Sequence, residues 1–230
     1  MEKEYPFYNG TTLLMDDRFF KLTTDTVLLS AFVQVKSGQK GLDLGAGIGS
    51  LGLLVMLRNQ GVAVDGIEIS QGAADLAQKN YDICSKSDLA KVTCGDYTKL
   101  TKCNKYDFCV TNPPYFSPQA GLHSQSAEID TARRGELFDV FSAAAKMLKP
   151  AGKLFMCLRA ERLGYAVGEL EKAGFCAKRI RFVHNTLDSQ ASIVMIEAIQ
   201  GKGEPKIEKP LILKDQSGYT KEYQEIYGTW

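Results

Sequence analysis

Short apolar runs alternate with amphipathic runs through residues 40–199. The apolar runs have the length of strands, and the runs between them repeat their apolar positions every three to four residues, as helices do. This alternation predicts right-handed βαβ units and a mostly parallel sheet. Strands are expected at 40–44, 62–68, 90–94, 106–111 and 153–158, and helices at 51–58, 70–80, 135–149 and 160–173.

The pattern changes near residue 175. Two further apolar runs, 176–184 and 192–199, are separated only by residues 185–191. A connection this short cannot hold a helical crossover, so the two strands should pair antiparallel. The predicted fold is therefore an α/β fold with a mostly parallel, seven-stranded sheet, an antiparallel last strand and helices on both faces.

The chain divides into three parts by this pattern. Residues 38–200 form the predicted core domain. Residues 1–37 hold a polar lead and then an apolar run at 24–33, which we expect to be a helix that packs on the core. Residues 201–230 are rich in Gly, Lys, Glu and Pro and have little periodicity, so we expect an extended surface tail there.

Composition is that of a globular protein, with 44% hydrophobic and 24% charged residues. No apolar run approaches the ~18 residues that cross a bilayer, and the N-terminus lacks the pattern of a secretory signal. The six cysteines have no C-x-x-C spacing, so we expect buried, reduced thiols. These features predict a cytoplasmic protein that is not inserted in a membrane.

The formal net charge is +1, which excludes a protein that coats nucleic acid by bulk charge. The charge is nevertheless uneven, because residues 146–185 carry nine basic and three acidic side chains. This segment is either a footprint for a polyanion or a solvated face of a helix and a strand.

A glycine loop follows the first strand of the core. Glycines at such a turn allow a tight backbone and let a ligand approach N–H groups at a helix N-terminus. The spacing fits two cofactor patterns. Residues 47–52 satisfy G-x-G-x-x-G, the dinucleotide pattern, and residues 43–49 satisfy D-x-G-x-G-x-G, the S-adenosylmethionine pattern. In the second pattern Asp43 is placed to hold an ammonium group of the ligand.

Two further carboxylates end strands. Glu68 ends the second strand, where a carboxylate accepts hydrogen bonds from the ribose hydroxyls of either cofactor. Asp96 follows the third strand and is placed to accept a hydrogen bond from an adenine amino group, or else to cap a turn.

Asn112-Pro113-Pro114-Tyr115 ends the fourth strand. Ligands of open parallel sheets bind at the carboxyl ends of strands near the switch point, so this turn should face the glycine loop. Two prolines stiffen the turn and remove two N–H donors. The Asn112 side-chain oxygen and the Pro113 carbonyl can then accept both hydrogens of one planar –NH₂ group, and the Tyr115 ring offers a surface on which a base can stack.

These motifs together resemble those of amino-methylating Class I methyltransferases, which have a Rossmann-like fold. The segments 20–29, 132–134, 181–184 and 219–228 further resemble the bacterial tRNA1(Val) (adenine(37)-N6)-methyltransferases. The resemblance implies that residues 38–200 form an S-adenosylmethionine-dependent methyltransferase domain. It implies methyl transfer to the exocyclic N6 amine of an adenine in tRNA, by a monomer or weak homodimer that needs no metal.

The resemblance also implies the site residues. The catalytic set is the turn of Asn112, Pro113, Pro114 and Tyr115. Cofactor contacts are expected from Thr24, Asp25, Asp43, Gly45, Ala46, Gly47, Gly49, Glu68, Ile69, Asp96, Tyr97 and Asn112. RNA contacts are expected from Tyr115, Phe116, Arg133, Arg134, Arg179 and Arg181.

Other interpretations remain open. A protein glutamine-N5 methyltransferase that acts on a translation factor could use the same turn, although such enzymes usually carry a longer helical N-terminal domain. A ribosomal RNA guanine-N2 methyltransferase is a second enzyme alternative. The turn and the antiparallel ending argue against an NAD dehydrogenase. A non-catalytic RNA-binding module that keeps a cofactor pocket is the alternative from another class.

Overall fold

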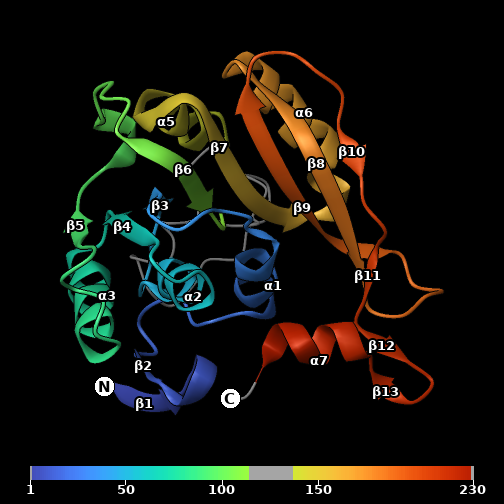
Figure 1. Ribbon diagram of the computed structural model, residues 1–230, viewed down its shortest axis with the longest axis horizontal. Helices are drawn as coiled ribbons and strands as arrows, with labels where there is room; N and C mark the ends of the chain where they lie inside the picture. The colour runs from blue at the N-terminus through green and yellow to red at the C-terminus, as the bar shows by residue number, and fades with distance from the viewer. Residues whose placement is uncertain (1, 114–136, 229–230) are drawn as a thin grey trace.

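The computed structural model describes residues 2–113 and 137–228, and a mixed sheet forms its centre (Figure 1). Seven longer strands follow the order β8-β9-β7-β6-β3-β4-β5. Strands β3 to β7 pair in parallel, and β9 runs antiparallel to both β7 and β8. The predicted α/β fold is therefore confirmed. The strands are β3 (Lys40–Leu44), β4 (Ala63–Glu68), β5 (Val92–Cys94), β6 (Tyr106–Thr111), β7 (Leu148–Arg159), β8 (Phe175–His184) and β9 (Ala191–Gln200).

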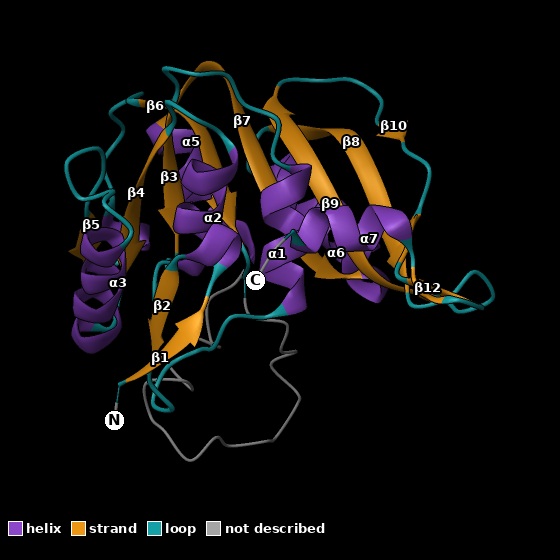
Figure 2. Ribbon diagram, turned by 60° about the horizontal axis from the view of Figure 1, so that its bottom comes forward, coloured by secondary structure: helices purple, strands orange, loops and turns teal. Residues whose placement is uncertain are grey.

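Helices cover both faces of this sheet (Figure 2). Alternate residues of a strand point to opposite faces, and the core is divided accordingly. Phe108 and Val110 of β6 belong to one buried cluster, and Cys109 between them belongs to the other. The first cluster includes residues of α1 (Thr24–Phe32), α2 (Ser50–Arg58) and α3 (Gln71–Ile83), and the second includes residues of α5 (Leu137–Met147) and α6 (Leu163–Lys172).

The N-terminal lead is more ordered than its polar sequence predicts. Strands β1 (Lys3–Pro6) and β2 (Thr12–Met15) form an antiparallel hairpin outside the main sheet. Asn80 of α3 is fully buried and holds this hairpin, because its side chain accepts from Leu14 N at 2.7 Å and donates to Leu14 O at 3.0 Å. Asn80 also donates to Ile48 O at 2.9 Å, so the hairpin and the glycine loop share one anchor.

The last thirty residues also contain more structure than a surface tail. Two short strands pair in parallel with β8 and widen the sheet to nine strands within the described residues. Leu211 has 0% exposure, and Tyr223 is buried. The sequence shows little periodicity here because these elements complete the edge of the sheet and cover α1 rather than form a core of their own. They are β10 (Lys206–Ile207), β11 (Leu211–Ile212), the hairpin β12 (Lys214–Asp215) and β13 (Gly218–Tyr219), and helix α7 (Lys221–Tyr227).

Two further expectations concern membrane-spanning helices and the state of the cysteines. Over residues 2–113 and 137–228, none of the helices combines the length and the apolar character that a membrane span requires. The six cysteines all lie in these ranges and form no disulfide. Three of them are buried as expected, and Cys103 is exposed.

Candidate functional site

A cavity of about 450 Å³ lies at the carboxyl ends of the central strands. The adjacent β3 and β6 pair in parallel with Asp43 opposite Val110, so the glycine loop and the end of β6 meet at one edge, as the sequence predicts. Ten of the predicted site residues line this cavity. They are Asp43, Gly45, Ala46, Gly47, Glu68, Ile69, Asp96, Tyr97, Asn112 and Pro113.

The glycine loop satisfies both spacing patterns for separate physical reasons. Gly45, Gly47 and Gly49 have φ values of 78°, 54° and 81°, a left-handed backbone that residues with a Cβ rarely adopt. Gly52, in the first turn of α2, is needed for space instead, because a Cβ there would lie 2.3 Å from the hydroxyl oxygen of Tyr81. The first three glycines shape the loop, and the fourth lets α2 pack closely against α3.

Glu68 connects the end of β4 to the glycine loop. Its Oε2 accepts from the backbone N–H of Gly47 at 2.8 Å, and its Oε1 accepts from that of Ser70 at 3.0 Å. The two bonds fix the plane of the carboxylate at the wall of the cavity. Each oxygen of a carboxylate can accept a second hydrogen bond, so Glu68 can also receive two ligand hydroxyls.

Asp43 is a buried carboxylate under the loop, with 1% exposure. Its Oδ2 accepts from the backbone N–H of Gly52 at 3.1 Å. Burial raises the pKa of Asp43 to about 7, and the charge of Glu68 contributes to the increase. Two carboxylates beside one cavity favour a ligand that carries positive charge there.

Asp96 and Tyr97 lie where β5 ends. Oδ1 of Asp96 accepts from Thr98 N at 2.9 Å and from Thr98 Oγ1 at 2.7 Å, which lowers the pKa of Asp96 and caps a short 3₁₀ turn. Asp96 is therefore a capping residue that also faces the cavity. Tyr97 lines the cavity, and burial raises the pKa of its hydroxyl group to about 12.

Asn112 is half-buried just beyond β6 and is held from two sides. Its Nδ2 donates to Oγ1 of Thr26 in α1 at 3.1 Å. Its Oδ1 accepts from Sγ of Cys157 in β7 at 3.2 Å. Pro113 follows and is buried. Pro114, Tyr115, Phe116, Arg133 and Arg134 lie outside the described residues.

The N-terminal segment enters the cavity through residues that the sequence did not identify. Thr23 and Thr26 line it, whereas Thr24 and Asp25 do not. Residues three apart share a face of a helix, and Thr24 instead points toward α7, where its hydroxyl oxygen lies 3.1 Å from that of Tyr227. Helical periodicity counted from Thr23 would have identified Thr26. The segment Arg18, Phe19, Phe20 and Lys21 also lines the cavity.

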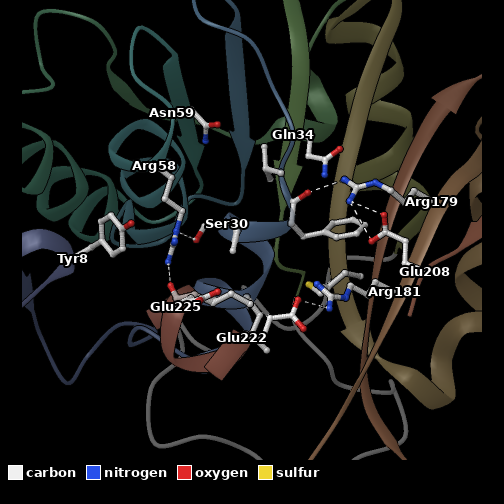
Figure 3. Close-up of a pocket in the computed structure, with 16 residues that line it drawn as sticks. Tyr8, Ser30, Gln34, Arg58, Asn59, Arg179, Arg181, Glu208, Glu222 and Glu225 are labelled. Atoms are coloured by element: carbon white, nitrogen blue, oxygen red, sulfur yellow. Dashed lines mark hydrogen bonds and ion pairs between the residues drawn. The ribbon is translucent and has the colours of Figure 1, made fainter. Parts of the chain in front are cut away.

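Arg179 and Arg181 lie on β8, which β7 and β9 separate from β6. They line a second cavity of about 470 Å³ beside α7 (Figure 3). Arg179 is 11% exposed in its side chain and donates to Glu197 at 2.9 Å and to the Phe32 carbonyl at 2.7 Å. Arg181 donates to Glu222 at 2.6 Å. The structure thus places both arginines apart from the first cavity, in contacts within the chain. Their acidic partners are distant in sequence, which is why the sequence did not reveal these contacts.

Comparisons with known proteins agree with this geometry. Residues 21–173 match the family described as "Methyltransferase small domain". The chain is 27% identical over 209 residues to the tRNA1(Val) (adenine(37)-N6)-methyltransferase of Actinobacillus pleuropneumoniae serotype 7 (strain AP76), covering 90% of this chain and 88% of the relative. It is 30% identical over 177 residues to the protein of that name from Trichodesmium erythraeum (strain IMS101), covering 74% and 73%.

Among solved structures, the fold is similar to one described as "a predicted O-methyltransferase" from Agrobacterium tumefaciens. The TM-score is 0.72 at 20% identity, and the match covers 90% of this chain and 98% of that chain. At 20% identity, the similarity to this structure is evidence for the fold alone. Together the comparisons confirm the resemblance and the fold class expected from the sequence.

Proposed function

Because this chain belongs to the methyltransferase small domain family and, within it, to the tRNA1(Val) (adenine(37)-N6)-methyltransferases, we propose that it methylates the exocyclic N6 amine of an adenine in tRNA. The methyl donor in this proposal is S-adenosylmethionine. A tRNA substrate also accords with a cytoplasmic location.

The observation that carries the proposal is the placement of Asn112 and Pro113 on the wall of the cavity that holds the glycine loop. The residues that we propose as acceptors of the amine hydrogens therefore line the same cavity as the cofactor motif. If the glycine loop were only a tight βα turn, or the prolines only stiffened the chain, the two segments would not need to line one cavity.

The cavity suits the proposed cofactor. The left-handed loop exposes backbone where a Cβ at Gly45 or Gly47 would meet no heavy atom within 4 Å. Glu68 is fixed in position to accept from ribose hydroxyls. Burial raises the pKa of the Asp43 carboxyl, and a cationic ligand beside it would stabilise its charged form. When bound, S-adenosylmethionine supplies the electrophile, a methyl carbon attached to a sulfonium.

The chain's own residues orient the nucleophile. The lone pair of an adenine N6 amine is delocalised into the ring, which makes the amine a poor nucleophile. Asn112 Oδ1 and the Pro113 carbonyl would accept its two hydrogens and hold the nitrogen as it becomes tetrahedral. These bonds strengthen as positive charge develops on the nitrogen, so they stabilise the transition state more than the ground state. The cationic product loses its proton readily and needs no strong base.

The substrate base must leave its stack to reach this cavity, as in other base-modifying enzymes. A loop adenine leaves its stack more easily than a paired one. Tyr115, Phe116, Arg133 and Arg134 remain the proposed RNA contacts, as stacking rings and phosphate partners. RNA affinity should then fall as salt rises.

The test is methyl transfer from tritiated S-adenosylmethionine by the full chain. Bulk tRNA, ribosomal RNA and a protein extract are offered separately, and the labelled RNA is digested to nucleosides. We expect the label in N6-methyladenosine from tRNA. Label in protein would favour a glutamine methyltransferase, label in guanosine a guanine-N2 enzyme, and tRNA binding without label a non-catalytic module. Each of these three results would overturn the proposal.

A further inference from the structure

Three elements converge on the side-chain amide of Asn112. The residue follows β6, its nitrogen contacts α1, and its oxygen contacts β7. The strand register explains the contact with Cys157. Thr111 of β6 lies opposite Met156 of β7 in a parallel pair, so the residues that follow them, Asn112 and Cys157, also lie opposite each other. The amide is therefore held at both ends by the fold.

Cys157 marks the oxygen end of the amide. Its thiol is fully buried and lies 3.2 Å from Asn112 Oδ1, closer than the 3.8 Å that separates it from the Asp25 carbonyl. A thiol has one hydrogen to donate and accepts only weakly, so it pairs better with the amide oxygen than with the amide nitrogen. An amide oxygen has two lone pairs, and the proposed function requires one of them for an amine hydrogen.

Thr26 marks the nitrogen end. It is 5% exposed, and its Oγ1 accepts from Asn112 Nδ2 at 3.1 Å. The same Oγ1 lies 3.2 Å from Oγ1 of Thr23, the residue that caps α1. With its oxygen accepting from Asn112, Thr26 can direct its own hydrogen to Thr23. This chain of bonds turns Nδ2 toward α1.

Helix α7 holds α1 in place. The Tyr227 hydroxyl oxygen lies 3.1 Å from Thr24 Oγ1, two residues before Thr26. Beside the cavity of Figure 3, Arg58 of α2 donates to Ser30 of α1 at 2.9 Å and to the Ile226 carbonyl of α7. The polar groups around that second cavity therefore fasten α7 to the body of the protein and help to fix the position of Thr26.

We propose that Thr26 and Cys157 are positioning residues, which hold the Asn112 amide with its oxygen presented to the target amine. The inference rests on the proposed function for its effect on catalysis, because the oxygen matters only if it accepts an amine hydrogen. A wrongly rotated amide would present N–H groups to the amine and repel it. Two contacts from different elements prevent that rotation and reduce the amide's freedom before substrate arrives.

The test compares variants that lose each contact with variants that keep it. Thr26→Val and Cys157→Ala remove the hydroxyl and the thiol, whereas Thr26→Ser and Cys157→Ser retain a polar hydrogen. We expect kcat for methyl transfer to fall about 10- to 100-fold in the first pair and to be largely restored in the second. KM for S-adenosylmethionine should change little, because Asn112 would hold the target amine rather than the loop.

Two matched controls separate positioning from loss of packing. Cys109→Ala removes an equally buried thiol from the neighbouring strand β6, on the opposite face of the sheet. Ser192→Ala removes a half-buried hydroxyl of β9, which donates to the Val183 carbonyl at 3.3 Å. Both should destabilise the fold about as much as the test variants and leave kcat of the folded protein near that of the wild type. Equal losses of kcat in test and control variants would overturn the inference.

A double-mutant cycle gives a readout that a merely structural role would not produce. If Thr26 acts through Asn112, adding Thr26→Val to Asn112→Ala should lower kcat no further. Independent further losses would overturn the inference.

The side-chain amide signal of Asn112, assigned by its absence in Asn112→Ala, supplies a test without substrate. Its ¹H–¹⁵N resonances should shift in Thr26→Val and return toward the wild-type position in Thr26→Ser. An unmoved signal would refute the positioning role even if the protein proved inactive on tRNA. A wild-type protein without tRNA activity but with the expected shift would refute only the proposed function.

Discussion

The backbone N–H of Gly47 donates to Oε2 of Glu68 at 2.8 Å. This bond connects the loop after β3 to the end of β4, so the carboxylate that would bind the cofactor also holds the loop that would surround it. Loop geometry and ligand affinity should therefore change together when Glu68 is altered.

Glu68→Gln should raise the Kd for S-adenosylmethionine at least ~10-fold, since a hydrogen bond to a charged group contributes ~1.5–3 kcal/mol. The amide has only one oxygen, so it cannot accept from both Gly47 and Ser70 while it receives the ribose. Isothermal titration calorimetry measures the change. Glu171→Gln, at an exposed position on α6, is the control and should bind as the wild type does. Equal affinities in all three proteins would contradict the assignment of Glu68.

Replacing Asp43 by Asn should have opposite effects on the stability of the protein and on its affinity for the cofactor. The pKa of Asp43 is about 7 in the folded chain, above its ordinary value of 3.8. Its stabilising contribution is therefore complete below pH ~4 and is lost as pH rises through ~7, because the folded state holds a proton that the unfolded state releases. Asp43→Asn keeps an oxygen for the Gly52 N–H and removes the buried charge.

Without cofactor, Asp43→Asn should accordingly melt at a higher temperature than the wild type at pH 8 and show a flatter dependence on pH between 4 and 7. The same variant should bind S-adenosylmethionine at least ~10-fold more weakly at pH 8, because a cationic ligand loses its charged partner. Thermal melts across pH and calorimetry measure both effects. Parallel pH profiles of the two proteins would exclude a raised pKa at Asp43.

Asn112→Ala should lower kcat for methyl transfer to tRNA at least ~100-fold, the scale for removal of one group that stabilises a transition state. The Kd for the cofactor should stay within a few-fold of the wild type, because Glu68 and the glycine loop remain. Single-turnover transfer of tritiated methyl groups measures the chemical step. Full activity of this variant would remove Asn112 from the mechanism.

Gly52→Ala should destabilise the protein by ~1–3 kcal/mol through overpacking, because the new Cβ would lie 2.3 Å from the Tyr81 hydroxyl oxygen. Tyr81→Phe removes that oxygen, and the next nearest atoms, Val64 Cγ1 and Tyr81 Cζ, lie at 3.4 and 3.5 Å. The double variant should therefore recover much of the lost stability, although it also loses the bond from Tyr81 to the Val64 carbonyl. Urea unfolding of all four proteins measures the coupling, and purely additive losses would show that the close approach is not the cause.

Arg179→Met should destabilise the fold by ~1–3 kcal/mol, because Glu197 loses its guanidinium partner while its other oxygen still pairs with Lys153 at 2.8 Å. The half-saturating tRNA concentration of the folded fraction should not change. Lys202→Met, at an exposed position near the same edge of the sheet, is the control for charge. Unchanged stability with weaker tRNA binding would restore Arg179 as a contact with RNA.

The sequence by itself determined the seven longer strands of the sheet, the glycine loop and the position of Asn112 at the end of β6. These features are local: apolar periodicity, glycine spacing and proline pairs act within a few residues, and the rule that ligands bind at the carboxyl ends of parallel strands brings the motifs together. The pattern also identified Glu68 and Asp43, since each stands at a strand end.

Only the tertiary structure decided what surrounds these residues. The contacts of Asn112 come from Thr26 and Cys157, which lie 86 and 45 positions away in the sequence. The ion pair of Arg179 and the position of α7 likewise depend on contacts between segments that are distant in the sequence. Hydrogen bonds and ion pairs between distant segments leave no periodic signal in the sequence. A polar residue that will be solvated and one that will pair with a distant residue cannot be distinguished by residue type, because only the folded chain brings the partner close.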